Sequence, residues 1–76
     1  MNLTTIGANQ TMITLSNGAQ VFYSYNTPVA ACLPGVGYVV TDVKHSTTTS
    51  KHINAWAGKG QPSRPQSFFD DLVKTA

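Results

Sequence analysis

The sequence predicts an α+β fold, a small antiparallel β-meander of about four strands followed by two short C-terminal helices. Apolar and polar residues alternate over residues 11–25, which is the pattern of strands, and the C-terminal third carries apolar residues at helical spacing. Glycine, proline and asparagine separate these segments, as turn formers do. The predicted bounds, within a single domain of residues 1–76, are about 11–45 for the strands and about 48–57 and 65–74 for the helices.

The first two strands, "TMITL" and "AQVFYSY", flank "SNG" and form a hairpin. A type I turn followed by Gly18 in the left-handed conformation pairs Ile13 with Val21. One face of the hairpin then contains Ile13, Leu15, Val21, Tyr23 and Tyr25. A two-residue Asn17-Gly18 loop would scatter the apolar residues over both faces, so we favour the longer turn.

The segment "TPVAACLPGVGYVVTDVKH" predicts two more strands. Thr27-Pro28 ends the second strand, because proline has no amide donor and biases the residue before it towards extended geometry. The small, apolar "VAACL" forms the third strand, "PGVG" supplies a turn, and the β-rich "YVVTDVKH" returns antiparallel. Along this last strand Val39, Thr41 and Val43 share one face, and Tyr38, Val40 and Asp42 share the other.

The hydroxyl residues Ser46–Ser50 indicate the start of a helix. Short hydroxyl side chains suit helix interiors poorly but cap helix N-termini well, so one of them is expected to be the cap. The stripe that this helix buries is Thr49, Ile53, Trp56 and Ala57. Gly58 is expected to end the helix in the left-handed conformation.

The second helix is "FFDDLVK", which follows the glycine- and proline-rich connector "KGQPSRPQ". Its apolar stripe is Phe68, Phe69, Leu72 and Val73. We expect Ser67 and Asp70 to form a capping pair, and Asp70 and Asp71 near the helix start and Lys74 at its end to complement the helix dipole. Both helices are expected to cover one face of the sheet.

Charge is unevenly distributed along the chain. No charged side chain occurs between Met1 and Thr41, and all five basic and three acidic side chains lie between Asp42 and Lys74. Exposed sheet edges normally carry Lys or Glu, which prevent pairing with other chains. An uncharged sheet with tyrosines therefore predicts a recognition or self-association surface. The alternative is that short strands and a covering helix make charges unnecessary.

The chemically versatile side chains do not form an enzyme pattern. His45 and His52 lack a convincing third ligand for zinc, and Cys32 lacks an orienting group and fits a small core residue. The "GKGQPS" segment lacks the spacing of a phosphate-binding loop. We therefore expect no catalytic residues, no metal and no cofactor.

Neither a membrane span nor an export signal is expected. No stretch approaches the ~20 apolar residues that cross a bilayer. The opening "MNLTTIGANQ" lacks the basic and apolar segments of a secretory signal. The expected compartment is the cytoplasm.

A resemblance covers about half of the chain, residues 17–56. The stretches "NG", "SYNTPVA", "GVGY" and "TTSKHIN" are similar to small uncharacterised proteins encoded by phages and prophages. The resemblance implies a bacterial host cell as the setting, and it transfers no activity and no catalytic residue. The tail, residues 58–76, lies outside it.

The expected function is that of a small interaction protein that binds a host or viral macromolecule, for example to inhibit a bacterial defence or housekeeping system. The alternative is a nucleic-acid-binding accessory protein, in which Lys44 and other cations contact phosphates and His45 or Trp56 stack on bases. Trp56 also suits the core, where a large aromatic ring contributes most to stability. The candidate partner-binding residues are Tyr23, Tyr25, Tyr38, Lys51, His52, Lys59 and Arg64, with Met12 and Phe22 joining Tyr38 if Tyr23 and Tyr25 point inward.

Overall fold

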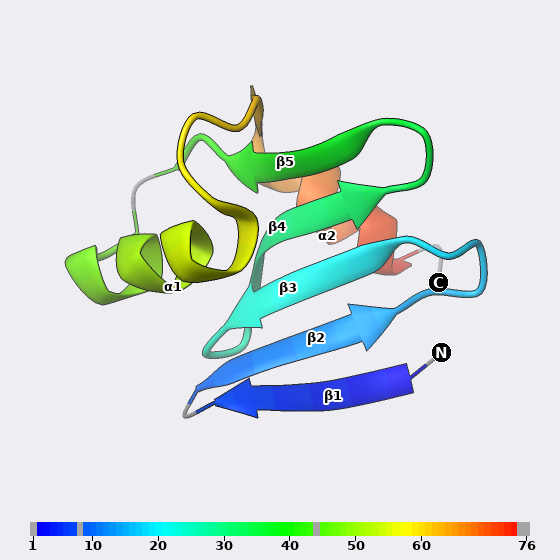
Figure 1. The fold of residues 1–76 in the computed structure, drawn as a ribbon, viewed down its shortest axis with the longest axis horizontal. Coiled ribbons are helices and arrows are strands. Elements are labelled where there is room, and N and C mark those ends of the chain that lie inside the picture. Colours follow the sequence, from blue (N-terminus) through cyan, green and yellow to red (C-terminus); the bar gives the residue numbers. More distant parts are fainter. Residues whose placement is uncertain (1, 8, 44, 75–76) are drawn as a thin grey trace.

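The computed structural model describes residues 2–7, 9–43 and 45–74. Its elements are β1 (Asn2–Gly7), β2 (Gln10–Thr14), β3 (Gln20–Ser24), β4 (Thr27–Leu33), β5 (Gly37–Thr41), α1 (Thr47–Ala57), β6 (Ser63–Arg64) and α2 (Gln66–Lys74). In this part of the chain six strands form one sheet in chain order, with β1 to β5 antiparallel and β6 parallel to β5 (Figure 1). The predicted α+β class is confirmed.

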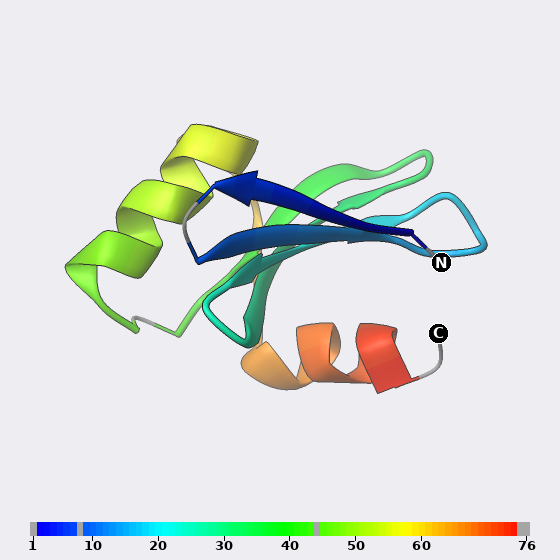
Figure 2. The ribbon, with the colours of Figure 1, turned by 90° about the horizontal axis from the view of Figure 1, so that it is seen from below.

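The two helices lie on opposite faces of the sheet, as Figure 2 shows. On one face, Ile53 and Trp56 of α1 pack against a cluster that includes Phe22. On the other, Phe69 of α2 packs against a cluster that includes Val39. The prediction that both helices cover one face is therefore wrong. The physical reason is that consecutive residues of the central strands alternate sides and are apolar on both, so each face needs its own cover.

The predicted hairpin register is confirmed. Ile13 lies opposite Val21, and the backbone N–H of Leu15 donates to the carbonyl of Ala19 at 2.7 Å. Gly18 has a φ of 90°, a conformation that disfavours other residues. Phe22 is fully buried beneath α1, so it does not belong to an outward set.

The turn between β3 and β4 differs from the prediction. Ser24 pairs with Thr27, so β4 begins at the threonine before Pro28 instead of β3 ending there. A register shift opposite Phe22 and Tyr23 accommodates the proline inside the sheet. Tyr25 lies beyond the end of β3, in this turn, with a φ of 58°.

Helix α1 follows the prediction closely. It begins at Thr47, and the Oγ atom of Ser46 accepts a hydrogen bond from the backbone N–H of Thr49 at 3.1 Å. Gly58 ends the helix with a φ of 87°. Thr49 and Ala57 are buried, as the predicted stripe requires.

Helix α2 begins one residue before its predicted cap, at Gln66. Ser67 therefore lies within the helix and does not cap it, and Asp70 and Asp71 lie beyond the first turn, which contains no acidic residue. The predicted Lys74 in the last turn is confirmed. The strand predicted to reach residue 45 ends at Thr41, and Lys44 lies outside the described residues.

Two strands were not predicted, one at each edge of the sheet. Strand β1 pairs along β2, with Leu3 opposite Ile13. Strand β6 forms within the proline-rich connector, where the carbonyl of Pro62 accepts from Val40 and the carbonyl of Arg64 accepts from Asp42, both at 2.9 Å. Strand β6 could not be predicted from the sequence, because two residues are too few to show a strand periodicity. Only its pairing with β5 defines it as a strand.

Candidate functional site

The two edges of the sheet differ in their protection against strand pairing. The β6 edge is two residues long, contains Arg64 and lies between Pro62 and Pro65. Short length, charge and proline are the features by which proteins protect exposed edges. Strand β1 is six residues long, "NLTTIG", and has neither charge nor proline. Among the described residues no strand pairs with its outer side, so β1 is an open edge.

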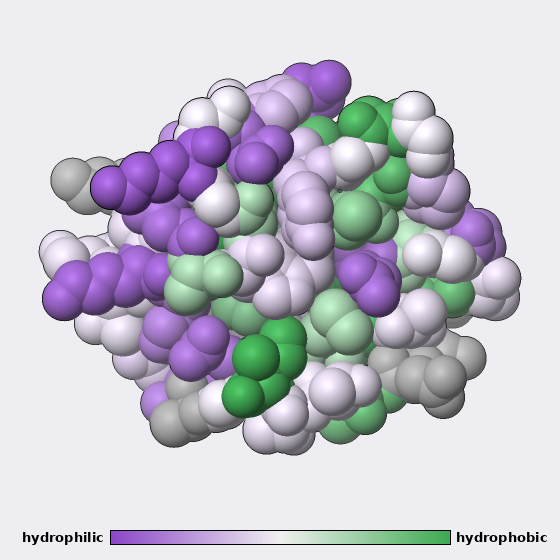
Figure 3. Space-filling view, viewed as in Figure 1, coloured by the Kyte–Doolittle hydropathy of each residue, from purple (hydrophilic) through white to green (hydrophobic). Residues whose placement is uncertain are grey.

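Apolar side chains accompany this open edge. Leu3 is 69% exposed and Ile6 is 47% exposed. Figure 3 shows green and pale side chains along the lower rim of the molecule, where β1 lies, and strongly hydrophilic ones gathered around α1. The open edge therefore combines unpaired backbone with exposed apolar surface.

A hollow of about 340 Å³ adjoins the edge. It is lined by Leu3, Thr11, Ile13, Tyr23, Tyr25 and Asn26. Leu3 lies opposite Ile13, and Ile13 lies opposite Val21, so these three side chains share one face of the sheet. Leu72 and Val73 of α2 pack on the same face, so the hollow lies on the side of the sheet that α2 partly covers. Burial, and to a lesser degree the negative charge of Asp70, raise the pKa of Tyr23 above its usual value of about 10. The hollow thus combines the apolar side chains of Leu3 and Ile13 with polar groups of Thr11, Asn26 and two tyrosines, and the hydroxyl of Tyr23 stays neutral.

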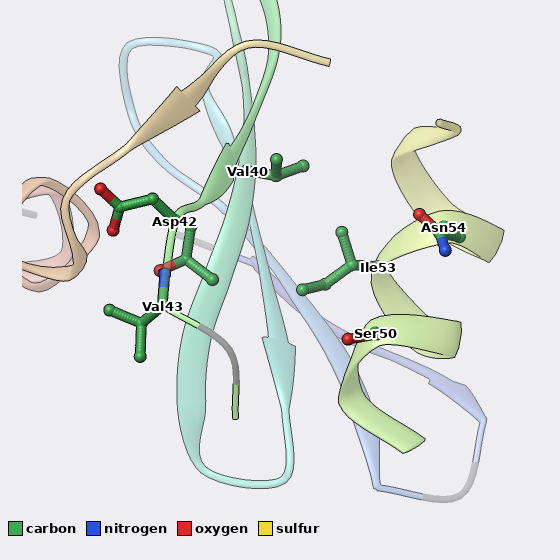
Figure 4. Close-up of a pocket in the computed structure, with 7 residues that line it drawn as sticks. Val40, Asp42, Val43, Ser50, Ile53 and Asn54 are labelled. Carbon is green, nitrogen blue, oxygen red and sulfur yellow. The ribbon is translucent and has the colours of Figure 1, made fainter. Parts of the chain in front are cut away.

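A second hollow, of about 300 Å³, lies between the end of β5 and α1. Figure 4 shows Val40 and Ile53 in the space between the strand and the helix, whereas the carboxylate of Asp42 points away from the helix. Ser50 and Asn54 supply the remaining labelled polar groups. Its one charged side chain points away, so this hollow lacks the converging charged groups of a catalytic site.

A polar cluster, buried at Ser24 and Thr49, joins β3 to α1. The Oγ atom of Ser24, which is 2% exposed, lies 2.9 Å from Nδ1 of His52 and 3.2 Å from Oγ1 of Thr49. Ser46 donates to the same Thr49 oxygen at 3.1 Å. A serine beside a histidine also occurs in nucleophilic sites of the Ser-His-Asp type, in which an acidic side chain orients the histidine. Here the side chain near His52 is the ring of Tyr25, at 6.1 Å between ring centroids. The cluster positions α1 on the sheet.

A second polar cluster centres on Gln66, which the sequence interpretation did not single out. Its Oε1 atom accepts from Oγ1 of Thr41 at 2.9 Å and lies 3.0 Å from Nε2 of His45, while its Nε2 donates to the carbonyl of Pro28 at 2.6 Å. Gln66 therefore ties the start of α2 to β4 and to the end of β5. These contacts could not be predicted from the sequence, because Gln66 and its partners are far apart in the chain and belong to no common motif.

The predicted site residues do not form one site. Tyr23 and Tyr25 line the hollow beside β1, and Tyr25 also approaches His52. Tyr38 lies opposite Cys32 in the β4–β5 ladder and meets the Trp56 ring edge-on at 5.3 Å. The cations Lys51, Lys59 and Arg64 are all exposed. Cys32 is only half-buried, which differs from its expected core position.

Trp56 is engaged within the protein. Its ring stacks on Phe22 at 5.0 Å between centroids and an interplanar angle of 13°, and Tyr38 packs edge-on against it. These contacts leave less of the ring for base stacking than the nucleic-acid interpretation requires. The predicted packing of Trp56 on the sheet is confirmed.

The described residues contain no group of three or more His, Cys, Asp or Glu side chains placed to hold a metal ion. None of the helices within them is long and apolar enough to cross a membrane.

The fold and the edge together define a small α+β protein whose sheet is protected at one side and open at the other. The chain belongs to DUF8033, a family of unknown function, whose model matches residues 1–71. This match extends into the tail that the sequence resemblance left out. No curated protein and no solved structure gives a significant match.

Proposed function

We propose that this chain is a protein-interaction module that binds a partner by adding a strand of that partner to the β1 edge. The observation that carries the proposal is the contrast between the two edges. The β6 edge has a charge, two prolines and minimal length, whereas β1 presents six uncharged residues, regular from Asn2 to Thr5 and irregular between Thr5 and Gly7. A sheet that protects one edge and leaves the other open is built to pair there.

The hollow beside β1 supports the proposal, because strand addition uses two kinds of contact. Backbone hydrogen bonds along the edge supply affinity, and pockets for alternate side chains supply specificity. Leu3 belongs both to the edge strand and to the wall of the hollow. An apolar side chain of the added strand fits this hollow, whereas an acidic one would meet the negative charge of Asp70 near Tyr23.

The partner we propose is a host or viral protein, and blocking a bacterial defence or housekeeping system is one outcome of such binding. This part of the proposal rests on the resemblance that we read in the sequence of residues 17–56 to small phage and prophage proteins. An inhibitor of this kind needs a binding surface and no catalytic group.

The test compares three tagged proteins in capture from bacterial lysate: the wild type, Thr4→Lys and Thr48→Lys. Both threonines are exposed, but Thr4 is on β1 and Thr48 is on α1, so the charge added is the same and only its place differs. A captured protein is then purified and its affinity measured against all three. We expect Thr4→Lys to lose binding and Thr48→Lys to retain it. Equal binding by both variants would rule out the edge as the site.

Nucleic-acid binding is the second candidate, supported by a local charge pattern. Residues 47–64 contain three cations, Lys51, Lys59 and Arg64, and no acidic residue, and all three are exposed. If they contact phosphates, affinity for a DNA or RNA probe must fall steeply between about 50 and 200 mM salt. Replacing Lys51 and Lys59 by glutamine should reduce that salt dependence, and the same change at Lys74 on α2 is the matched control.

A further inference from the structure

We infer that in the free protein the β1 edge is covered by the β1 edge of a second copy of this chain, in antiparallel pairing, so that partner binding competes with self-pairing. This inference rests on the proposed role of β1 as a binding edge. The charge, the register and the side chains of β1 favour a second copy of this chain as the strand that pairs with it in the free protein.

The charge pattern permits two copies to meet at β1. The strand and its three neighbours, β2 to β4, contain no charged residue, and the formal charge of +2 arises entirely from residues beyond 41. Like charges directly opposite one another destabilise a strand pair, and antiparallel self-pairing brings the central residue of the strand opposite its own copy and the flanking residues close to theirs. An uncharged strand avoids this repulsion, whereas the Arg64 edge would place two arginines near each other.

Symmetry restricts the register to few choices. When a strand pairs antiparallel with its own copy, the numbers of opposite residues have a constant sum, and that sum is even because opposite side chains share a face. Centring the pair on Thr4 opposes Thr4 to itself and Leu3 to Thr5 of the second copy, and only its outermost pair, residue 2 with Ile6, reaches the irregularity that β1 shows between Thr5 and Gly7. Centring it on Thr5 moves the inner pair, Thr4 with Ile6, into that irregularity, and centring it on Leu3 leaves only residues 2–4 of β1 opposite one another. The register centred on Thr4 is therefore favoured.

This register gives the exposed side chains suitable neighbours. Two threonines directly opposite form one of the favourable cross-strand pairs. The two Leu3 residues become diagonal neighbours, roughly 7–8 Å apart between Cα atoms, which long side chains can bridge. The 69% exposed Leu3 is thereby covered. Because the twofold axis is perpendicular to the sheet, the hollows of both copies lie on one face of the joined sheet, beside their α2 helices.

The first experiment is sedimentation velocity over a range of micromolar concentrations. We expect the wild type and Thr48→Lys to form dimers as concentration rises, and Thr4→Lys to remain monomeric. Circular dichroism spectra equal to that of the wild type would show that Thr4→Lys is folded. A wild type that stays monomeric at high micromolar concentration, or a Thr4→Lys variant that dimerises as the wild type does, would overturn the inference.

The second experiment tests the register by disulfide cross-linking in a Cys32→Ala background. Directly opposite residues have Cα atoms about 4.5–5.5 Å apart, within the range of a disulfide, whereas diagonal ones exceed about 7 Å. We expect Thr4→Cys to cross-link readily, and Thr5→Cys and the exposed control Thr48→Cys to cross-link slowly. Equal rates at Thr4 and Thr48 would contradict pairing through β1, and faster linking at Thr5 would contradict the register.

The inference and the proposed function fail separately. If the protein is monomeric but Thr4→Lys still loses the captured partner, the edge binds a partner and self-pairing is refuted. If Thr4→Lys abolishes the dimer but leaves capture unchanged, self-pairing stands and the proposed partner binding at β1 is refuted. Competition of the purified partner with the dimer is the result expected when both hold.

Discussion

Replacing Trp56 by alanine tests how α1 is held on the sheet. Trp56 stacks on Phe22 and meets Tyr38 edge-on, with 5.0 and 5.3 Å between ring centroids. Truncating a packed tryptophan to alanine costs about 3–5 kcal/mol, and the two aromatic pairs contribute about 0.5–1.5 kcal/mol each beyond burial. Because Trp56 is only partly buried, we expect the lower end, about 3 kcal/mol.

This loss is large for a protein of 76 residues, whose total stability at typical values per residue is about 4–11 kcal/mol. It corresponds to a fall in Tm of about 12–24 °C. Urea unfolding followed by far-ultraviolet circular dichroism measures the change without relying on the tryptophan itself. Trp56→Phe, which retains a ring over Phe22, is the control and should cost about 1 kcal/mol.

Two results would refute this reasoning. The first is an unfolding midpoint for Trp56→Ala within error of the wild type. The second is native wild-type tryptophan fluorescence at the wavelength of a fully hydrated indole, because a ring stacked on Phe22 excludes water from that face.

Three further predictions concern the packing of α2, the cap of α1 and the hydroxyl of Tyr23. Phe69→Ala, at a fully buried residue, should destabilise the protein by about 3–5 kcal/mol in urea unfolding, and a loss below about 1 kcal/mol would contradict the packing of α2. Ser46→Ala should cost about 1 kcal/mol, since it removes the cap of α1, and Ser46→Asp should restore most of it. The raised pKa of Tyr23 keeps its hydroxyl neutral in the folded state while the unfolded state ionises. The resulting stability is complete below the unfolded-state pKa of about 10 and is lost as pH rises through the higher folded-state pKa. Tyr23→Phe should therefore weaken the fall in stability as pH rises above about 10, and an unchanged slope would oppose this.

Features that depend on neighbouring residues could be predicted from the sequence. The turn at Gly18 follows from its left-handed conformation and from the alternation of Ile13 and Val21 on either side. The bounds of α1 follow from Ser46 and Gly58, because capping is decided within one helical turn. The start of α2 was predicted to within one residue, but its cap was misplaced at Ser67, since Gln66 is positioned by Thr41 and Pro28, which are far away in the chain.

The candidate site shows the same division. The sequence has no charged residue before Asp42, and this predicts an uncharged sheet that is open to pairing with another chain. Which strand lies at the edge depends on the pairing order of the whole sheet, and "NLTTIG" has no strong strand pattern by itself. Likewise, Phe22 pointed outward in the hairpin considered alone, yet α1 covers it in the folded protein. Local sequence determines turns and caps because their energies are local. Edges, covered faces and the hollow beside β1 arise only when residues distant in the chain pack together.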